Sequence, residues 1–142
     1  MCRQILIDCS SPILELTLAN ENTPVSEAPI FITGFEITDS EVCSGPNTIV
    51  GTEIKPEGSC KICICQHPWQ PPVATGIVTL SALANGHEII AKIKWVFTGE
   101  SFPTDSLLEA EDVLSPWIVK VPEVPPHGGM GSVTVRFMKG LE

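Results

Sequence analysis

The dipeptide Asn85-Gly86, set between two runs of alternating apolar residues, constrains the fold more than any other feature of this sequence. A two-residue Asn-Gly turn favours the type I′ geometry, whose twist matches the twist of the strands on either side. The flanking runs are rich in β-branched and aromatic residues, which prefer a pleated surface to a helix. We therefore predict a long β-hairpin over residues 76–99.

The turn also sets the register of the predicted hairpin. Counting outward from the turn pairs Ala82 with Ile89, and further along it pairs Val78 with Ile93. Successive side chains of a strand point to opposite faces, so one face of the hairpin is expected to be almost wholly apolar. Four residues of the second strand are predicted to be buried on that face, namely Ile89, Ala91, Ile93 and Trp95.

Turn signals rich in glycine and proline separate seven further segments that have strand patterns. These segments are residues 3–9, 14–18, 30–38, 48–54, 60–66, 117–121 and 132–138. Residues 44–47 (SGPN) are predicted to form a turn. The capping-box spacing of Ser106 and Glu109 predicts one short helix over residues 106–114.

The segment 30–38 carries a glycine within its strand pattern. A glycine at such a position often marks a β-bulge, and we predict one at Gly34. Alternation along the segment predicts that Phe31, Phe35 and Ile37 share one face, with Ile30 on the other.

About nine short strands and at most one short helix predict an all-β fold. The length of 142 residues fits a single domain over 1–142 with a core of its own. An antiparallel two-sheet sandwich of the Greek-key, immunoglobulin-like kind is the first choice of architecture, and a jelly roll is the second.

The charge of the chain excludes some partners and favours others. The net charge is −9, from 8 Lys and Arg against 17 Asp and Glu, and the basic residues are scattered. Nucleic acid and anionic membranes bind through basic patches, so neither is expected as a partner. The sequence has no apolar run of about 20 residues and no signal-peptide pattern at its start, which predicts a soluble, cytoplasmic protein.

The densest group of metal-capable side chains lies in residues 60–67 (CKICICQH). Zinc takes four such ligands in a tetrahedron, so Cys60, Cys63, Cys65 and His67 form a candidate zinc site, with Cys43 in reserve. The spacing is unfavourable, because a strand places alternate residues about 6.6 Å apart along one face. The other interpretations are buried structural thiols, kept reduced in the cytoplasm, and a disulfide or redox role.

Two proline-rich stretches are candidate partner-binding segments. Residues 66–72 contain Trp69, Pro71 and Pro72, and extended proline-rich segments are recognised by other proteins. Trp69 is interpreted either as an anchor for a partner or as a residue that packs on the hairpin. The loop 122–131 contains His127 and is the second candidate segment. Self-association through a sheet edge is a further route to a complex.

The sequence offers no recognisable catalytic set. His127-Gly128-Gly129 has the composition of an esterase oxyanion loop, but the chain lacks the Gly-x-Ser-x-Gly nucleophile motif. The acidic residues cannot be paired as a general acid and base from the sequence. The prediction is therefore a non-catalytic structural or protein-interaction module without a cofactor, and the alternative is a metal-binding or thiol-redox protein that uses residues 60–67.

Overall fold

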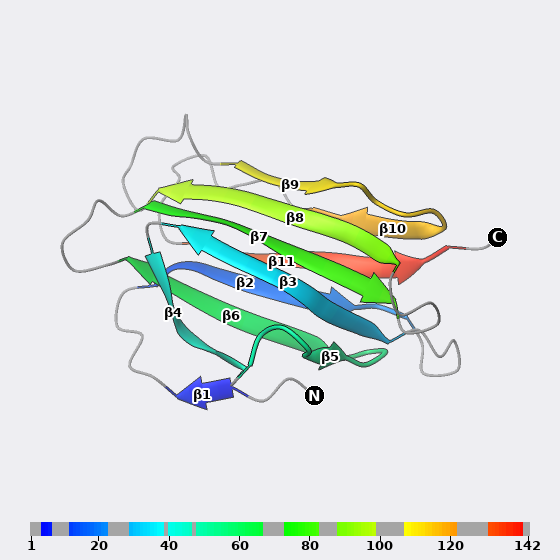
Figure 1. Cartoon of the computed structure of the whole chain (residues 1–142), viewed down its shortest axis with the longest axis horizontal. Helices are drawn as coiled ribbons and strands as arrows, with labels where there is room; N and C mark the ends of the chain where they lie inside the picture. The colour runs from blue at the N-terminus through cyan, green and yellow to red at the C-terminus, as the bar shows by residue number, and fades with distance from the viewer. Residues whose placement is uncertain are drawn as a thin grey trace.

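The computed structural model of the chain consists of two β-sheets packed against each other (Figure 1). It describes residues 4–6, 12–22, 29–38, 40–46, 48–66, 73–82, 88–98, 107–121 and 131–140. All regular elements within these ranges are strands. The same ranges contain no helix of the length and apolar character that a membrane crossing requires.

One sheet has six strands and the other has five. The first contains β1 (Gln4–Leu6), β2 (Pro12–Asn20), β4 (Ser40–Pro46), β6 (Ser59–Gln66), β10 (Trp117–Lys120) and β11 (Gly131–Lys139), in the order β1-β4-β6-β2-β11-β10. The second contains β3 (Ile30–Thr38), β5 (Glu53–Ile54), β7 (Val73–Ala82), β8 (Ile89–Thr98) and β9 (Leu107–Glu111), in the order β5-β3-β7-β8-β9. Neighbouring strands are antiparallel except β2 and β11, which pair in parallel. The predicted all-β, two-sheet sandwich is confirmed.

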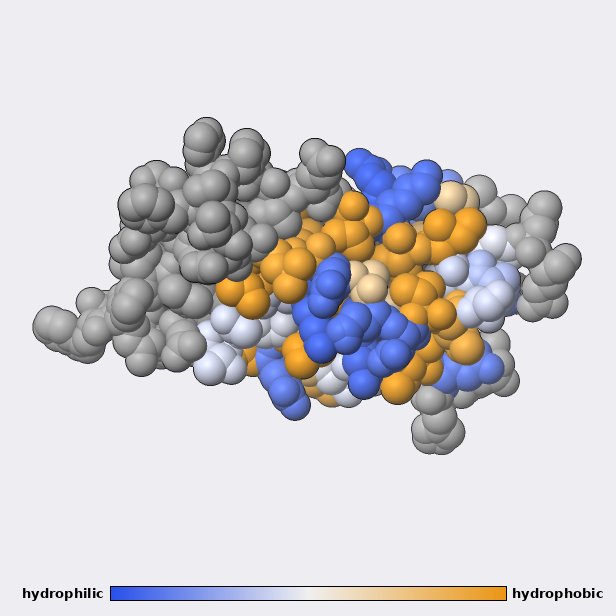
Figure 2. All heavy atoms as spheres, turned by 90° about the horizontal axis from the view of Figure 1, so that it is seen from above, coloured by the Kyte–Doolittle hydropathy of each residue, from blue (hydrophilic) through white to orange (hydrophobic). Residues whose placement is uncertain are grey.

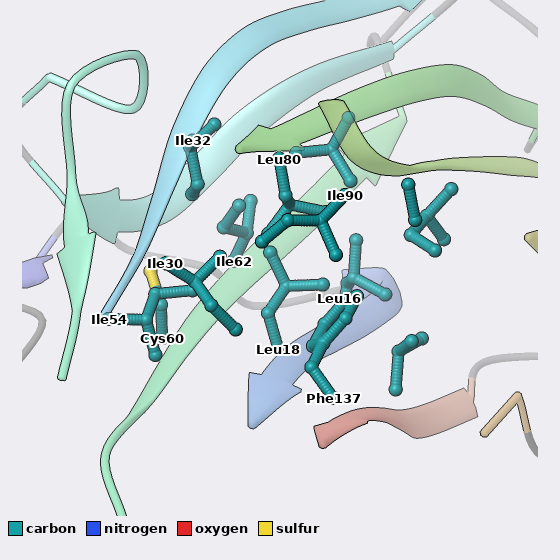
Figure 3. Close-up of a cluster of buried hydrophobic side chains, with 14 of the residues drawn as sticks. Leu16, Leu18, Ile30, Ile32, Ile54, Cys60, Ile62, Leu80, Ile90 and Phe137 are labelled. Carbon is teal, nitrogen blue, oxygen red and sulfur yellow. The ribbon is translucent and has the colours of Figure 1, made fainter. Parts of the chain in front are cut away.

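The core lies between the two sheets, where strict alternation brings apolar side chains together (Figure 3). β2 contributes Leu14, Leu16 and Leu18, each fully buried, and the residues between them point outward. β11 contributes Val133, Val135 and Phe137 in the same way. This period of two is the pattern expected of strands with one buried face.

The predicted hairpin is present as β7 and β8, and most of its register is confirmed. Val78 pairs with Ile93 and Gly76 pairs with Trp95, as expected. A Cβ atom at Gly76 would collide with the Trp95 ring and with the Glu36 carbonyl oxygen, so glycine permits this close packing. The Asn85-Gly86 turn itself lies outside the described residues.

One part of the predicted register is wrong. Ile89 pairs with Ser81 instead of Ala82, because the pairing shifts by one residue between Leu80 and Ser81. Ile89 is therefore 41% exposed, and Ile90, predicted to face outward, is fully buried. Such a bulge reverses the face of the residues beyond it.

The bulge predicted at Gly34 is confirmed by a register shift between Ile32 and Gly34. The bulge also changes which side chains of β3 face the core, and this change was not predicted. Phe35 and Ile37 pack against the core after the bulge, on the side of Ile32, and do not share a face with Phe31.

Three other predicted elements need correction. The predicted helix 106–114 is wrong, because residues 107–111 form strand β9, which pairs with β8 and buries Leu108. Residues 44–46 belong to strand β4 instead of a turn, and of the predicted strand 48–54 only Glu53–Ile54 is a strand. Pairing with a neighbouring strand overrides the local signal in the first two cases, whereas residues 48–52 form a turn with backbone hydrogen bonds such as Thr52 N–H to the Ile49 carbonyl. Figure 2 shows hydrophilic and hydrophobic residues side by side on the face seen from above in Figure 1, toward which β9 lies.

A buried pair of asparagines joins several strands at one end of the sandwich. Asn20 Nδ2 donates to the carbonyl of Ile54 at 2.9 Å, and Asn22 Nδ2 donates to Asn20 Oδ1 at 2.8 Å. Asn22 Oδ1 in turn accepts from the Lys139 backbone N–H at 2.8 Å. The pair thereby ties β2 to β5 and β11, and it satisfies polar groups that would be costly to bury alone.

Candidate functional site

An apolar pocket opens on the outer face of the five-stranded sheet, the sheet that lies in front in Figure 1. It lies where β3 begins and β7 ends, beside the turn that precedes β5. Its volume is about 350 Å³, toward the lower end of the range for ligand pockets. The lining residues are Phe31, Ile32, Thr33, Val50, Gly51, Ser81 and Ala82.

Backbone hydrogen bonds hold one wall of this pocket in place. The Ile32 N–H donates to the Thr52 carbonyl at 3.0 Å, and the Gly51 N–H donates to the Ile32 carbonyl at 2.7 Å. Gly51 has a φ of 97°, a conformation that residues with a side chain rarely adopt. The turn 48–52 therefore stays against β3 and holds Val50 at the pocket rim, where its side chain is 47% exposed.

The two β-bulges of the five-stranded sheet flank the pocket. One separates Phe31 from Phe35, so that Phe31 remains outside while Phe35 turns to the core. The other brings Ile89 opposite Ser81 and leaves Ile89 on the outer surface. Three outward apolar side chains therefore lie on this face: Ile89, placed there by a bulge, Phe31, placed there by alternation, and Val50 of the turn 48–52.

The charged residues of this sheet fall into two groups. On β8 the lysines are paired, with Lys94 Nζ at 2.7 Å from Glu111 and Lys92 Nζ at 3.6 Å from Asp112. The hydrogen bond that Lys94 donates to the Glu111 carboxylate raises the pKa of Lys94 above its usual 10.5, and nearby carboxylates add to the effect. Glu53 and Glu88, nearer the pocket, and Glu36, further along β3, have no ion-pair partner within the described part of the chain.

The predicted cysteine strand is present as β6, and its side chains divide between two faces. Cys60 lies in the core with Ile30 and Ile54 of the opposite sheet (Figure 3), whereas Cys63 and Cys65 point to the other side. Cys60 and Cys65 are disulfide-bonded. They lie five residues apart in an extended strand, about 16 Å, which is too far for a bond to each other. Two separate disulfide bonds are therefore present.

Cys63 differs from its two neighbours because it keeps its thiol and is buried. The prediction of buried cysteines thus holds for Cys60 and Cys63. The oxidised state of Cys60 and Cys65 differs from the expectation of reduced thiols, and a disulfide sulfur is not the thiolate that zinc binds. Only a reduced chain would offer the predicted ligand set. Within the ranges described, no three His, Cys, Asp or Glu side chains gather as metal ligands do.

The remaining predicted site residues cannot be placed. His67, Trp69, Pro71, Pro72 and His127 lie outside the described residues. The backbone of Cys43 is part of β4, but its side chain is not described. The partner-binding role of the proline-rich segments therefore stays a prediction.

The pocket was not predicted from the sequence. Phe31 was assigned to a face with Phe35 and Ile37, and Val50 was assigned to a strand, so no group of outward apolar residues was recognised. Gly51 was a usable signal, because a glycine inside the predicted strand 48–54 weakens the strand pattern and is compatible with a tight turn. No glycine or other turn residue in the sequence indicates the bulge opposite Ser81.

Comparison with known proteins identifies the fold but no family. No family model and no curated protein matches the sequence. Two solved structures are similar: IP-1A from Alcaligenes faecalis, with a TM-score of 0.70 and 18% identity over 91% of each chain, and the RahU protein, solved in complex with a TRIS molecule. RahU has a TM-score of 0.73 and 10% identity over 92% of this chain and 97% of its own. These similarities show a shared fold, and a shared fold does not determine function, so the function has to be inferred from the site.

Proposed function

We propose that this protein is a non-catalytic interaction module that binds an apolar side chain of a partner protein in the pocket beside β5. The observation that carries the proposal is the pocket of about 350 Å³, with exposed Val50 and Ile89 on the same sheet face. Buried apolar anchors in such pockets commonly dominate the binding energy of protein interfaces. The rigid sheet beneath would hold the pocket ready for a partner.

The same reasoning favours a protein over other classes of partner. The net charge of −9 opposes binding to nucleic acid and to anionic membranes, which require basic surfaces. No pair of acid and base residues lines the pocket, so the proposal assigns it binding and no reaction.

A phage-displayed library of random peptides tests this function. We expect enriched peptides to share an apolar residue and to lose binding to the Val50→Ser variant. Ile118→Ser is the matched control, because Ile118 is also 47% exposed but lies on β10 of the other sheet. An equal loss of binding in both variants, or no enrichment at all, would contradict the proposed function.

A thiol-redox role is the second candidate, and the state of β6 is the observation that favours it. Cys63 keeps its thiol two residues from the disulfide-bonded Cys65, on the same face of the strand. A thiolate attacks a disulfide sulfur, so Cys63 could form a bond to Cys65 while the former partner of Cys65 leaves as a thiolate, and the number of disulfides stays the same. We expect Cys63 to react with a thiol reagent only after partial unfolding, because it is buried.

The disulfide bonds also bear on the compartment. Disulfides persist in oxidising compartments and are rare in the cytoplasm. They therefore weigh against the predicted cytoplasmic location, which stays a prediction. Thiol titration of the denatured protein, isolated from its native source, would distinguish the cytoplasm from an oxidising compartment. The sequence has six cysteines, so six reactive thiols fit the cytoplasm, and two or fewer fit an oxidising compartment, because two disulfides use four of them.

A further inference from the structure

The carboxylates near the pocket define the chemistry of the segment that it would bind. Glu53 is the cross-strand partner of Phe31, a lining residue, and Glu36 lies further along β3 on the exposed side. Glu88 directly precedes Ile89, whose strand partner Ser81 lines the pocket. Three carboxylates thus belong to strands or strand ends that build the site.

Several acidic residues of the described chain are neutralised by ion pairs, whereas these three carboxylates are not, and Glu57 and Glu109 share that property. Glu15, Glu21, Glu111 and Asp112 each form an ion pair with a basic residue. Among the residues that the structure describes, Glu36, Glu53 and Glu88 have no such partner. Lys55, in the turn beyond β5, is the one lysine of that turn and cannot balance three carboxylates. The pocket therefore opens on a surface with an excess of negative charge.

The same charges argue against a second copy of this chain as the occupant. An isologous contact would place the acidic surroundings of one pocket against those of the other. Like charges brought together at an interface oppose association. A partner with positive charges beside its apolar anchor would instead meet complementary charges, which favour both encounter and correct orientation.

We infer that the pocket beside β5 binds a basic protein segment, in which one apolar side chain enters the pocket and flanking Lys or Arg residues face Glu36, Glu53 and Glu88. This inference rests on the proposed function and adds the charge of the partner to it. The apolar contact supplies most of the affinity, and the charges supply selectivity for the segment.

Four synthetic peptides separate the two contributions: KKLKK, KKSKK, GGLGG and EELEE. Each is titrated to about 5 mM into the ¹⁵N-labelled full chain, and amide shifts are followed by NMR. We expect KKLKK to shift the amides around Phe31 and Gly51 and to bind about tenfold more tightly than KKSKK, which lacks the apolar anchor. It should also bind about tenfold more tightly than EELEE, and added salt should narrow that difference.

A combined variant tests the three carboxylates directly. Glu36→Gln, Glu53→Gln and Glu88→Gln together should remove the preference for KKLKK over GGLGG. Glu109→Gln is the control, because Glu109 is exposed on β9, at the opposite edge of the same sheet, and should leave the preference unchanged.

Each other outcome has a defined meaning. Equal binding of KKLKK, GGLGG and EELEE at the pocket would overturn the basic partner and leave the proposed function standing. No shift at the pocket with any peptide containing leucine would overturn both. Shifts of the same amides with protein concentration alone, or with phosphatidylcholine vesicles, would identify a second copy or a lipid surface as the occupant and overturn the inference.

Discussion

Two regions of the sandwich both contain β-bulges, but the side chains on their surfaces differ in chemistry. Around the pocket, bulges interrupt the pairing of β7 with β3 and with β8. Around Cys63 and Cys65, bulges interrupt the pairing of β6 with β2 and with β4. The first region is open and apolar, whereas the second holds a buried thiol beside a disulfide-bonded cysteine.

The difference shows that a bulge does not by itself determine what a surface does. A bulge turns side chains to the other face, and the chemistry of those side chains decides the result. Near the pocket it leaves Ile89 outside, and apolar surface is exposed. In the cysteine region the extra residues belong to β2 and β4, so β6 keeps its regular alternation, and its cysteines bury well and form covalent links.

The largest expected effect concerns the cysteine region. Reduction of the protein should lower its free energy of unfolding by about 2–5 kcal/mol for each disulfide, because the bonds constrain the unfolded chain. Urea unfolding with and without a phosphine reductant measures this change. The Val50→Ser variant should lose the same amount on reduction, since the pocket has no part in the bonds. Superimposable curves with and without reductant would contradict the two disulfide bonds.

A pair of neighbouring substitutions tests the bulge near the pocket. Ile90→Ala should destabilise the protein by about 2–5 kcal/mol, because Ile90 is fully buried. Ile89→Ala should change stability by less than about 0.5 kcal/mol, because Ile89 is 41% exposed. In a hairpin without the bulge, Ile89→Ala would destabilise the protein more than Ile90→Ala. Chemical denaturation of the two variants side by side therefore decides between the registers.

The smallest expected effect concerns the turn that forms the pocket wall. Gly51→Ala should destabilise the protein by about 1 kcal/mol, because the φ of 97° is unfavourable for alanine. The added methyl group itself would meet open space, so the cost is one of backbone conformation. Val50→Ser, in the same turn, serves as the control and should be neutral within about 0.5 kcal/mol. A Gly51→Ala variant as stable as the parent would show that the turn adopts another conformation in solution.

Much of the fold could be predicted from local pattern. Leu14, Leu16 and Leu18 alternate with polar residues, and that pattern assigned the strand and its buried face. The Asn85-Gly86 signal gave the pairing of Val78 with Ile93. β9 could not be predicted in this way, because its capping-box spacing suits a helix and only the free edge of β8 makes it a strand.

The candidate site was less predictable, since it depends on residues that are distant in the sequence. Phe31, Val50 and Ser81 come together only when β3 pairs with β7 and the turn 48–52 closes on Ile32. Residues 60–67 are chemically distinctive, and their composition therefore predicted a site there. The bonded state of Cys60 and Cys65 depends on cysteines that are distant in the sequence, so no local pattern indicates it.

The sequence by itself determined that this chain forms short strands with one apolar face each, because a period of two is a local property of the chain. The tertiary structure alone decided where that period is interrupted. A bulge has a small local cost and depends on how two strands meet, so its position is settled by packing across the sheets. The outward position of Ile89 and the inward turn of Phe35 follow from that packing, and the pocket forms beside Phe31, which plain alternation already places outside.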